Sequence, residues 1–353
     1  MGEPQELRMR FFLCGLLAAS VFSAISSVAT ANDIEILPSA TAGASSPPEV
    51  YLAGEITDDT VAQLASLIPS RGLAGSIVYL DSAGGDPQAG MRLGELIRGS
   101  SMNTAIGKPG KTSGRPSPGK CMSACVLTYA GGKFRFIDPA SQLGIHRFYR
   151  RTAQSTDLDV AQVLSAAITA YLIKMGVVPA LFERMVQVGR GQMELLSHSD
   201  AARLNLVNNG VLPAEWGIEG KQGQVYLMGR QQTWNGTGKL IMSCAPNQRV
   251  RFSALYDAGD NNGFITRNAT NYTLRINKQF LPIASLQGKP SVSGDYVLAS
   301  FTPDDSMLWA ISGGEQLGFG FHTKDSNTFY GFLVDATGEQ DLVRSWIKHC
   351  TDR

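Results

Sequence analysis

Short apolar runs alternate with helical repeats near the start of the chain. The runs at residues 50–53, 76–80 and 104–106 predict strands, and the second is apolar without interruption, which is typical of a strand buried on both faces. Between them, residues 58–68 place apolar side chains at helical spacing. A second helix is predicted to begin at Pro87, because proline is tolerated in the first turn. This alternation over short connections predicts an α/β architecture.

Further helices are predicted downstream of this first block. Thr156 caps a long helix that Gly176 ends. Two shorter helices follow at residues 179–188 and 199–204, and the second leads into a strand at residues 206–207. These elements extend the predicted α/β domain.

The pattern changes after Trp216. Short β-type runs broken by Gly, Asn and Asp predict a smaller β-rich domain, a sandwich or a barrel, with strands at residues 224–228, 240–243, 250–256, 272–276, 296–301, 308–311 and 329–334. A helix with one apolar stripe is predicted at residues 339–350. We call residues 49–215 the first region and residues 220–353 the second region.

The N-terminal segment has the features of a signal peptide. Arg8 and Arg10 precede an apolar run, and Ala29-Thr30-Ala31 is a small-x-small cleavage site. We expect residues 1–31 to be removed and the protein to be exported to the periplasm; an uncleaved membrane anchor is the alternative. Residues 32–48, small, polar and ending in proline, are interpreted as a flexible linker.

Charge argues against some classes of partner. The net charge is +1 and charged residues make up 17% of the chain. A balanced chain of this kind lacks the basic field that nucleic-acid binding needs, so we expect no nucleic-acid partner.

The cysteines point to an oxidising compartment. Four remain after removal of the signal peptide, and an even count in an exported protein favours two disulfides. The predicted pairs are Cys121–Cys125 and Cys244–Cys350. A zinc site is a weaker interpretation, and Cys121 and Cys125 as two small buried apolar side chains are the alternative for the first pair.

Three segments carry the groups that an acyl-transfer serine enzyme needs. Ser123 lies at the start of a predicted helix, where the free N–H of Ala124 can donate to a developing oxyanion. Gly85, in a loop where a side chain would block close approach, can supply the second N–H donor. His146, at the end of a predicted strand, can accept the serine proton. Each residue taken singly has an ordinary structural explanation as a cap, a turn or a hydrogen-bonding residue.

The order of these segments resembles one family. Residues 50–212 resemble the proteolytic subunit of the Clp protease and its wider crotonase-like superfamily. The likeness rests on six segments. Residues 51–56 resemble the family's opening strand with a glycine, and the Asp-Ser-Ala-Gly-Gly loop at residues 81–85 stands where the family has Asn-Ser-Pro-Gly-Gly. Residues 121–124 resemble its nucleophile turn, residues 130–136 its β-turn, residues 145–146 its Ile-His pair and residues 199–207 its closing helix and strand.

The resemblance implies a fold of stacked β-α units and a peptidase. Ser123 would be the nucleophile and His146 the base, and Gly85 and Ala124 would form the oxyanion hole. The substrate would be a peptide or an unfolded protein, no cofactor would be required, and the chain could form a homo-oligomer. The family's ATP-driven partner is not expected, because an exported protein meets no ATP.

The third member of the triad departs from the family pattern. Counting back from residues 199–207 places the family's aspartate at Met193. Glu194 is adjacent, but a shift of one residue in an extended segment turns a side chain to the other face. Three interpretations remain: Glu194 serves through a local bulge, a backbone carbonyl orients His146, or activity is weak or lost.

An insertion relative to the family precedes the nucleophile. Residues 107–120 are rich in Gly and Pro and carry four positive charges, Lys108, Lys111, Arg115 and Lys120. A basic flap beside the active site and a solvated loop are both compatible with this composition. A phosphate-binding loop is disfavoured, because Pro109 interrupts the motif and no helix follows.

Three functions remain in consideration. The first is an exported serine peptidase that works without ATP. The second is a non-catalytic envelope interaction protein on the same fold, favoured by the missing aspartate. The third, an acyl-CoA enzyme of the crotonase type, suits the fold but not the compartment. The second region offers no catalytic set, so recognition or oligomer contact is its expected role, with Trp234, Trp309 and Trp346 expected in its core.

Overall fold

A computed structural model gives the structure of the chain. It describes residues 33–39, 47–110, 115–148, 157–189, 191–221, 223–246, 249–324 and 329–352. The predicted signal peptide and the capping residue Thr156 therefore lie outside the described residues. Within the described part of the chain, no helix is both long and apolar enough to cross a membrane.

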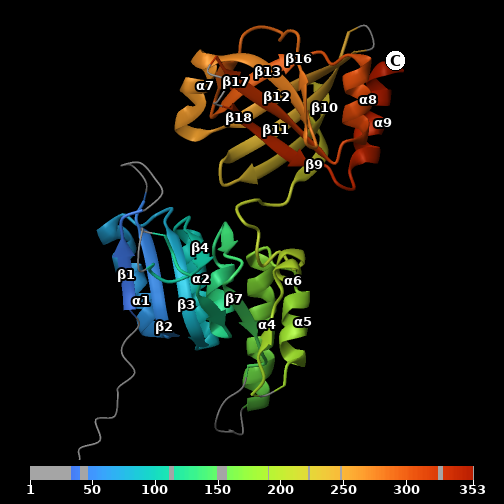
Figure 1. Cartoon of the computed structure of the whole chain (residues 1–353). Helices are drawn as coiled ribbons and strands as arrows, with labels where there is room; N and C mark the ends of the chain where they lie inside the picture. Colours follow the sequence, from blue (N-terminus) through green and yellow to red (C-terminus); the bar gives the residue numbers. More distant parts are fainter. Residues whose placement is uncertain are drawn as a thin grey trace, which may run out of the picture. The chain divides into compact units, whose positions relative to one another are not determined.

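The first region is built on a mainly parallel sheet (Figure 1). Its main path runs β1-β2-β3-β5-β7-β8, and β4 joins β3 to β6. The long strand β3 pairs with β4 through residues 77–80 and with β5 at Ser82, so it belongs to both branches of the sheet. The strands are β1 Asp33–Leu37, β2 Glu49–Ile56, β3 Ile77–Gly85, β4 Asn103–Ile106, β5 Lys120–Met122, β6 Arg135–Ile137, β7 Gln142–Ile145 and β8 Glu194–Leu195.

Helices connect these strands, which confirms the predicted α/β architecture. They are α1 Asp58–Arg71, α2 Pro87–Gly99, α3 Ala124–Ala130, α4 Asp157–Lys174, α5 Ala180–Gln187 and α6 His198–Arg203. The start of α2 follows its sequence signals: the Asp86 carboxylate accepts the N–H of Ala89 at 2.7 Å, and proline occupies the first turn. The predicted strand at residues 206–207 is wrong, because this segment forms turns without a strand partner.

Two arginines, one buried and one half-buried, hold the C-terminal end of α3, the helix that begins after Ser123. The Arg135 side chain is 2% exposed and donates to the carbonyls of Gly132 and Leu206. Arg98 donates to the carbonyls of Gly131 and Gly132. Burial lowers the pKa of the Arg135 guanidinium to about 10. Cations at a helix C-terminus satisfy its last carbonyls, so α3 is fixed at the end opposite Ser123.

A strand occupies part of the predicted linker. Residues 33–37 form β1, which pairs antiparallel with β2 in a regular register from Asp33↔Ala53 to Leu37↔Glu49. The interpretation of residues 32–48 as a flexible linker is therefore wrong for these five residues. The alternation of polar and apolar residues in Asp-Ile-Glu-Ile-Leu is the signal that indicated a strand.

The second region consists of two antiparallel sheets (Figure 1). One has the order β15-β16-β12-β11-β10-β9 and the other β14-β13-β17-β18. The strands are β9 Glu215–Lys221, β10 Gln224–Thr233, β11 Gly236–Ala245, β12 Arg249–Asp257, β13 Ala269–Ile276, β14 Gln279–Pro282, β15 Ser291–Ser293, β16 Tyr296–Phe301, β17 Gln316–Thr323 and β18 Phe329–Asp335. The prediction of a β-rich second region is confirmed.

One predicted strand of the second region is a helix. Residues 308–311 lie in α8, Asp305–Gly313, because the Asp304 carboxylate accepts the N–H of Met307 at 2.8 Å and so begins a helix. The region also contains the short 3₁₀ helix η1 at Gly259–Asn261, and α7 at Asn262–Asn268. The predicted C-terminal helix is confirmed as α9, Gln340–Thr351.

Two separate hydrophobic clusters support the two regions. One draws its buried residues from positions 50–207 and the other from positions 227–350. Trp346 belongs to the second cluster and donates its indole N–H to the Met242 carbonyl at 2.9 Å. The placement of the other two tryptophans in the core is wrong: Trp234 is 48% exposed and Trp309 is 82% exposed.

Candidate active site

Three adjacent parallel strands bring the predicted catalytic residues together. β3, β5 and β7 are neighbours and run in the same direction, so their carboxyl ends meet at one edge of the sheet. Gly85 ends β3, Ser123 follows β5 and His146 follows β7. The three segments, far apart in the sequence, therefore converge because of the strand order.

Ser123 and His146 are in direct contact. The distance from His146 Nε2 to Ser123 Oγ is 2.7 Å, so with the proton on Nδ1 the imidazole accepts the serine hydroxyl proton. Ser123 is 9% exposed, which removes most competing water from its hydroxyl. This is the geometry that a serine nucleophile and its general base require.

The backbone at Ser123 is held in an unusual conformation. Its φ of +57° and ψ of −125° lie outside the regions that side-chain-bearing residues ordinarily adopt. The turn is fixed by its own hydrogen bonds: Ser123 N–H donates to the Gly144 carbonyl at 2.9 Å, and Val126 N–H donates to the Ser123 carbonyl at 3.0 Å. Strained residues of this kind concentrate at functional sites, because only a surrounding structure can hold them.

A disulfide brackets this turn. Cys121, in β5, is bonded to Cys125, in α3, with a Cα–Cα distance of 5.2 Å, and both side chains are fully buried. The predicted pairing around Ser123 is confirmed, as is the Cys244–Cys350 pair, which joins β11 to α9. The first bridge closes the strand-to-helix turn that presents the serine hydroxyl.

The glycine pair packs tightly on both sides. Gly84 has a φ of +110°, and a Cβ added to it would lie 2.7 Å from the Ser123 Cβ. Gly85 has a φ of +153°, and its added Cβ would lie 2.2 Å from the Ile56 carbonyl oxygen. Any side chain would therefore displace either the predicted nucleophile or the end of β2.

The register of β3 against β2 directs the N–H of Gly85. Gly85 pairs with Ile56 in the parallel ladder, and Asp86 N–H donates to the Ile56 carbonyl at 2.9 Å. In a parallel ladder one residue of each pair makes both hydrogen bonds, and in this pair it is Ile56. Gly85 therefore directs its own N–H and carbonyl away from β2. The other neighbour of β3 is β5, which leads to Ser123. The register thus directs the Gly85 N–H toward the Ser123 side of β3.

The second predicted oxyanion donor lies in the first turn of α3. Ala124 is the first residue of this helix and directly follows Ser123. N–H groups in a first helical turn have no acceptor within the helix. The Ala124 N–H therefore stays the predicted donor from α3.

Ser82 is a residue that the sequence analysis did not assign. Its hydroxyl donates to the Gly54 carbonyl at 2.6 Å and accepts the Gly84 N–H at 3.0 Å. It thereby ties β2 to the glycine turn at the point where the turn approaches Ser123. The sequence signal was its place immediately before the Ala-Gly-Gly run.

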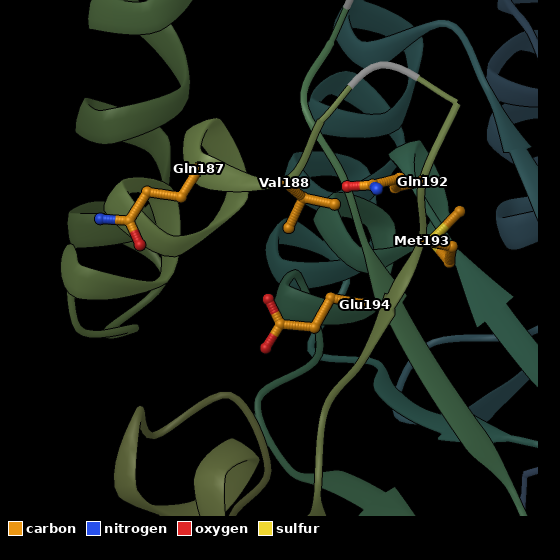
Figure 2. Close-up of a pocket in the computed structure, with 5 residues that line it drawn as sticks. All are labelled: Gln187, Val188, Gln192, Met193 and Glu194. Atoms are coloured by element: carbon orange, nitrogen blue, oxygen red, sulfur yellow. The ribbon is translucent and has the colours of Figure 1, made fainter.

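The third predicted residue does not face His146. β8 pairs antiparallel with β7 in the register Gly144↔Leu195 and Ile145↔Glu194, without a bulge. Continued by one residue, this register sets Met193 opposite His146. Residues directly opposite in an antiparallel pair share a face, so Glu194 lies on the face of Ile145. Figure 2 shows the Met193 and Glu194 side chains pointing to opposite sides of the chain.

The Glu194 carboxylate is occupied by another partner. Arg184 Nε donates to Glu194 Oε1 at 2.6 Å, and the same guanidinium contacts the Asp200 carboxylate at 3.2 Å. Hydrogen bonds from Ser197 and Arg184 lower the pKa of Asp200. The interpretation of Glu194 as a triad acid acting through a local bulge is therefore wrong: it belongs to an ion-pair network with α5 and α6.

A pocket of about 570 Å³ lies beside β8, lined by Gln187, Val188, Gln192, Met193 and Glu194 (Figure 2). Ser123 and His146 are absent from its lining. Because it does not include the serine–histidine pair, we assign it no part in the reaction. Among the described residues, no three His, Cys, Asp or Glu side chains are grouped as a metal site.

The insertion before Ser123 is anchored at both ends. Lys108 and Ser117 form an antiparallel bridge with two backbone hydrogen bonds of 3.0 and 2.8 Å. Lys120 N–H donates to the Asp81 carboxylate at 2.9 Å. Lys111 lies outside the described residues, so the choice between a basic flap and a solvated loop stays a prediction.

Known proteins resemble the chain in structure and not in sequence. No protein-family model matches the sequence, and no curated protein matches it. A ClpP1 mutant from Listeria monocytogenes is similar over 45% of this chain and 87% of its own, with 15% identity and a TM-score of 0.35. A mutant of the 1510-N membrane-bound stomatin-specific protease is similar over 45% of this chain and 75% of its own, with 17% identity and a TM-score of 0.35. The function of this chain therefore has to be argued from its own residues.

Proposed function

We propose that the protein is a serine peptidase that hydrolyses peptides or unfolded chains through an acyl-enzyme. One observation carries this proposal: the 2.7 Å contact between His146 Nε2 and the hydroxyl of Ser123, a residue held at a φ of +57°. A serine hydroxyl is a weak nucleophile at neutral pH unless a base accepts its proton. The contact supplies that base, and the strained turn presents the hydroxyl.

The reaction proceeds in two halves. Ser123 Oγ attacks the substrate carbonyl while its proton moves to His146 Nε2, and the resulting oxyanion is stabilised by the N–H groups of Gly85 and Ala124. His146 then returns the proton to the leaving amine, and the acyl group stays on Ser123. In the second half a water molecule attacks the ester while its proton moves to His146. His146 returns this proton to Ser123 Oγ as the acyl–oxygen bond breaks, and the acid is released.

His146 works without Glu194 in this proposal, because Arg184 holds the Glu194 carboxylate. Removing the acid of a serine triad costs much of the rate but not all of it. The proposed reaction therefore does not require the Glu194 carboxylate.

Export is part of the same proposal. Cleavage after Ala31 would deliver the chain to the periplasm, an oxidising compartment in which disulfides form and persist. The Cys121–Cys125 and Cys244–Cys350 bonds suit that location. The peptidase would then act without an ATPase partner.

A peptide-cleavage assay tests the proposal. The oxidised protein is incubated with an unfolded protein such as reduced, alkylated casein, and new amino termini are counted by mass spectrometry. We expect cleavage that Ser123→Ala abolishes and that Ser66→Ala, an exposed serine on α1, leaves unchanged. If the Ser123→Ala protein cleaves the substrate as fast as the wild-type protein, the proposal is wrong.

A second candidate function is a non-catalytic interaction protein of the envelope. It is favoured by Met193, which follows the register into the position opposite His146 where the family has an acid. Under this hypothesis the oxidised protein cleaves no peptide, and Ser123→Ala changes neither its stability nor its partners.

A further inference from the structure

One face of the four-stranded sheet in the second region is floored by glycines. The register aligns Arg275 with Gly318 and, in the next row, Thr273 with Gly320 and Gly331. Side chains on the same face alternate along each strand, so these residues share the face away from the core residues Leu274 and Phe319. The side chains of neighbouring residues lie over this floor: a Cβ on Gly320 would lie 2.5 Å from Thr273 Oγ1 and 2.7 Å from the Phe329 ring.

Two phenyl rings flank an arginine over this floor. Phe280 comes from β14 and Phe329 from β18, and their ring centroids are 5.6 Å apart. The guanidinium carbon of Arg275 lies 5.1 Å from each centroid. The rings are 48% and 39% exposed, so solvent reaches this cluster. We call these three residues, with Thr273 and His322, the Arg275 cluster.

The Arg275 guanidinium has one donor without an acceptor. Its Nε is shielded from solvent and has no hydrogen-bond partner. Within the described ranges, no carboxylate forms an ion pair with it. Burial lowers the pKa of Arg275. The residue as a whole is only partly buried, so an anion would meet the outer nitrogens of the guanidinium and balance its charge there.

The two polar side chains of the cluster, Thr273 and His322, contact each other. His322 Nε2 and Thr273 Oγ1 are 2.9 Å apart. Burial, and then the positive charge of Arg275, lower the pKa of His322, so its ring is neutral near pH 7. The cluster therefore offers a ligand one cation and two hydrocarbon rings.

We propose that the Arg275 cluster binds the C-terminal carboxylate of a peptide whose last residue is apolar. An arginine can hold a carboxylate through two parallel N–H bonds, and an anion that reaches Arg275 lies beside a phenyl ring. In a C-terminal residue the carboxylate and the apolar side chain share one Cα, so both meet their partners together. This binding site is separate from the Ser123 chemistry and goes beyond it.

Other anionic ligands match the cluster less well. A carbohydrate needs several hydroxyl partners, and Thr273 and His322 are bonded to each other. A phosphate dianion carries twice the charge of a guanidinium, and Arg275 is the one cation of the five residues in the cluster. The single charge of a carboxylate equals the single charge of the Arg275 guanidinium.

The first test varies the ligand and leaves the cluster intact. Isothermal titration calorimetry is performed on the full-length Ser123→Ala protein, so that no peptide is consumed. The probes are a hexapeptide ending in leucine with a free carboxylate, the same peptide as its C-terminal amide, and a free-acid peptide ending in glycine. We expect the leucine acid to bind about tenfold or more tightly than either control, the range of a charge-assisted hydrogen bond.

The second test varies the protein. Arg275→Gln should weaken binding of the leucine acid about tenfold and make the acid and the amide equivalent, whereas Arg275→Lys should keep part of the preference. Two matched controls should bind normally. Arg344→Gln removes an arginine that is paired with Asp341, and Trp309→Ala removes the exposed tryptophan of α8.

Several results would overturn the proposal. Equal binding of acid and amide, or no binding of the acid up to about 1 mM, would exclude carboxylate recognition. If Arg344→Gln weakens binding of the leucine acid as much as Arg275→Gln does, the peptide binds through general charge attraction and not at the cluster. If inorganic phosphate or a polyuronic acid binds more tightly than the peptide, the cluster is a site for that anion and not for a peptide C-terminus. Since all titrations use the Ser123→Ala protein, their outcome does not depend on whether the proposed peptidase is active.

Discussion

In the first region the reactive side chains follow strand ends, whereas in the second region the Arg275 cluster lies on a sheet face. The parallel strands β3, β5 and β7 deliver Gly85, Ser123 and His146 to one edge. Antiparallel strands reverse at each turn, so their ends do not converge, and alternate residues instead collect on a face. Strand direction therefore decides where each region can bring polar and charged side chains together.

The two disulfides differ in the same way. Cys121–Cys125 spans 4 residues and fixes one turn, whereas Cys244–Cys350 spans 106 residues and closes most of the second region. A short loop restricts the unfolded chain little, and a long loop restricts it much more. The first bond therefore serves local geometry and the second serves stability.

The largest expected effect concerns the strand-end site. His146→Ala should lower the rate of peptide cleavage about 10⁴-fold, because Ser123 loses its base. Steady-state kinetics on an unfolded protein substrate measures it. His198→Ala is the matched control, since this histidine lies on α6 and contacts the Ser141 carbonyl. A loss of the same size in the control would mean that the assay reports damage to the fold.

The next largest expected effect is a difference in stability between variants that lack one or the other disulfide. Replacing Cys244 and Cys350 by alanine should lower the free energy of unfolding by about 5 kcal/mol, against about 2 kcal/mol for Cys121 and Cys125. Three of the four tryptophans lie in the second region, and the fourth, Trp216, lies in β9, which pairs with β10 of that region. Intrinsic fluorescence during urea unfolding therefore follows the second region, and far-UV circular dichroism follows both regions. Equal shifts for the two pairs would contradict the assignment of different roles.

Gly85→Ala should disturb both the site and the fold. Its new Cβ would lie 2.2 Å from the Ile56 carbonyl oxygen at a φ of +153°, which costs about 2–4 kcal/mol of stability and displaces an oxyanion donor. Circular dichroism with denaturant and the cleavage assay measure the two effects. Gly99→Ala, which meets no atom within 4 Å, should change stability by about 0.5 kcal/mol or less. A neutral Gly85→Ala variant would show that the turn is less tightly packed than described.

Glu194→Gln should have the smallest effect. Its carboxylate pairs with Arg184, and both side chains are about one third exposed, so the ion pair adds little stability. We expect the cleavage rate to fall about twofold or less. A fall of several orders of magnitude would restore Glu194 to the reaction.

The strand-end site could be foreseen because its signals are local. Ser123, His146 and the Gly84-Gly85 pair each follow a strand, and their order along the chain resembles a known family. The place of Glu194 could not be foreseen, because it depends on the pairing register of a two-residue strand. A shift by one residue would have turned its carboxylate to the His146 side.

The sheet-face cluster was invisible in the sequence for a physical reason. β17 carries Gly318 and Gly320, which interrupt the apolar alternation and hid the strand. The structure explains them: a Cβ on Gly318 would lie 2.0 Å from the Phe332 carbonyl oxygen. Similarly, the apolar run at residues 308–311 was ambiguous until the cap at Asp304 showed a helix. Long-range contacts decided the first case, and the local cap at Asp304 decided the second.

The central claim is that Ser123 is an activated nucleophile. The most direct measurement is reaction of the oxidised protein with a fluorophosphonate, followed by mass spectrometry of the labelled peptide. We expect one adduct on Ser123, formed in the wild-type protein and lost in His146→Ala. No adduct at any pH between about 6 and 9, or equal labelling in His146→Ala, would contradict it.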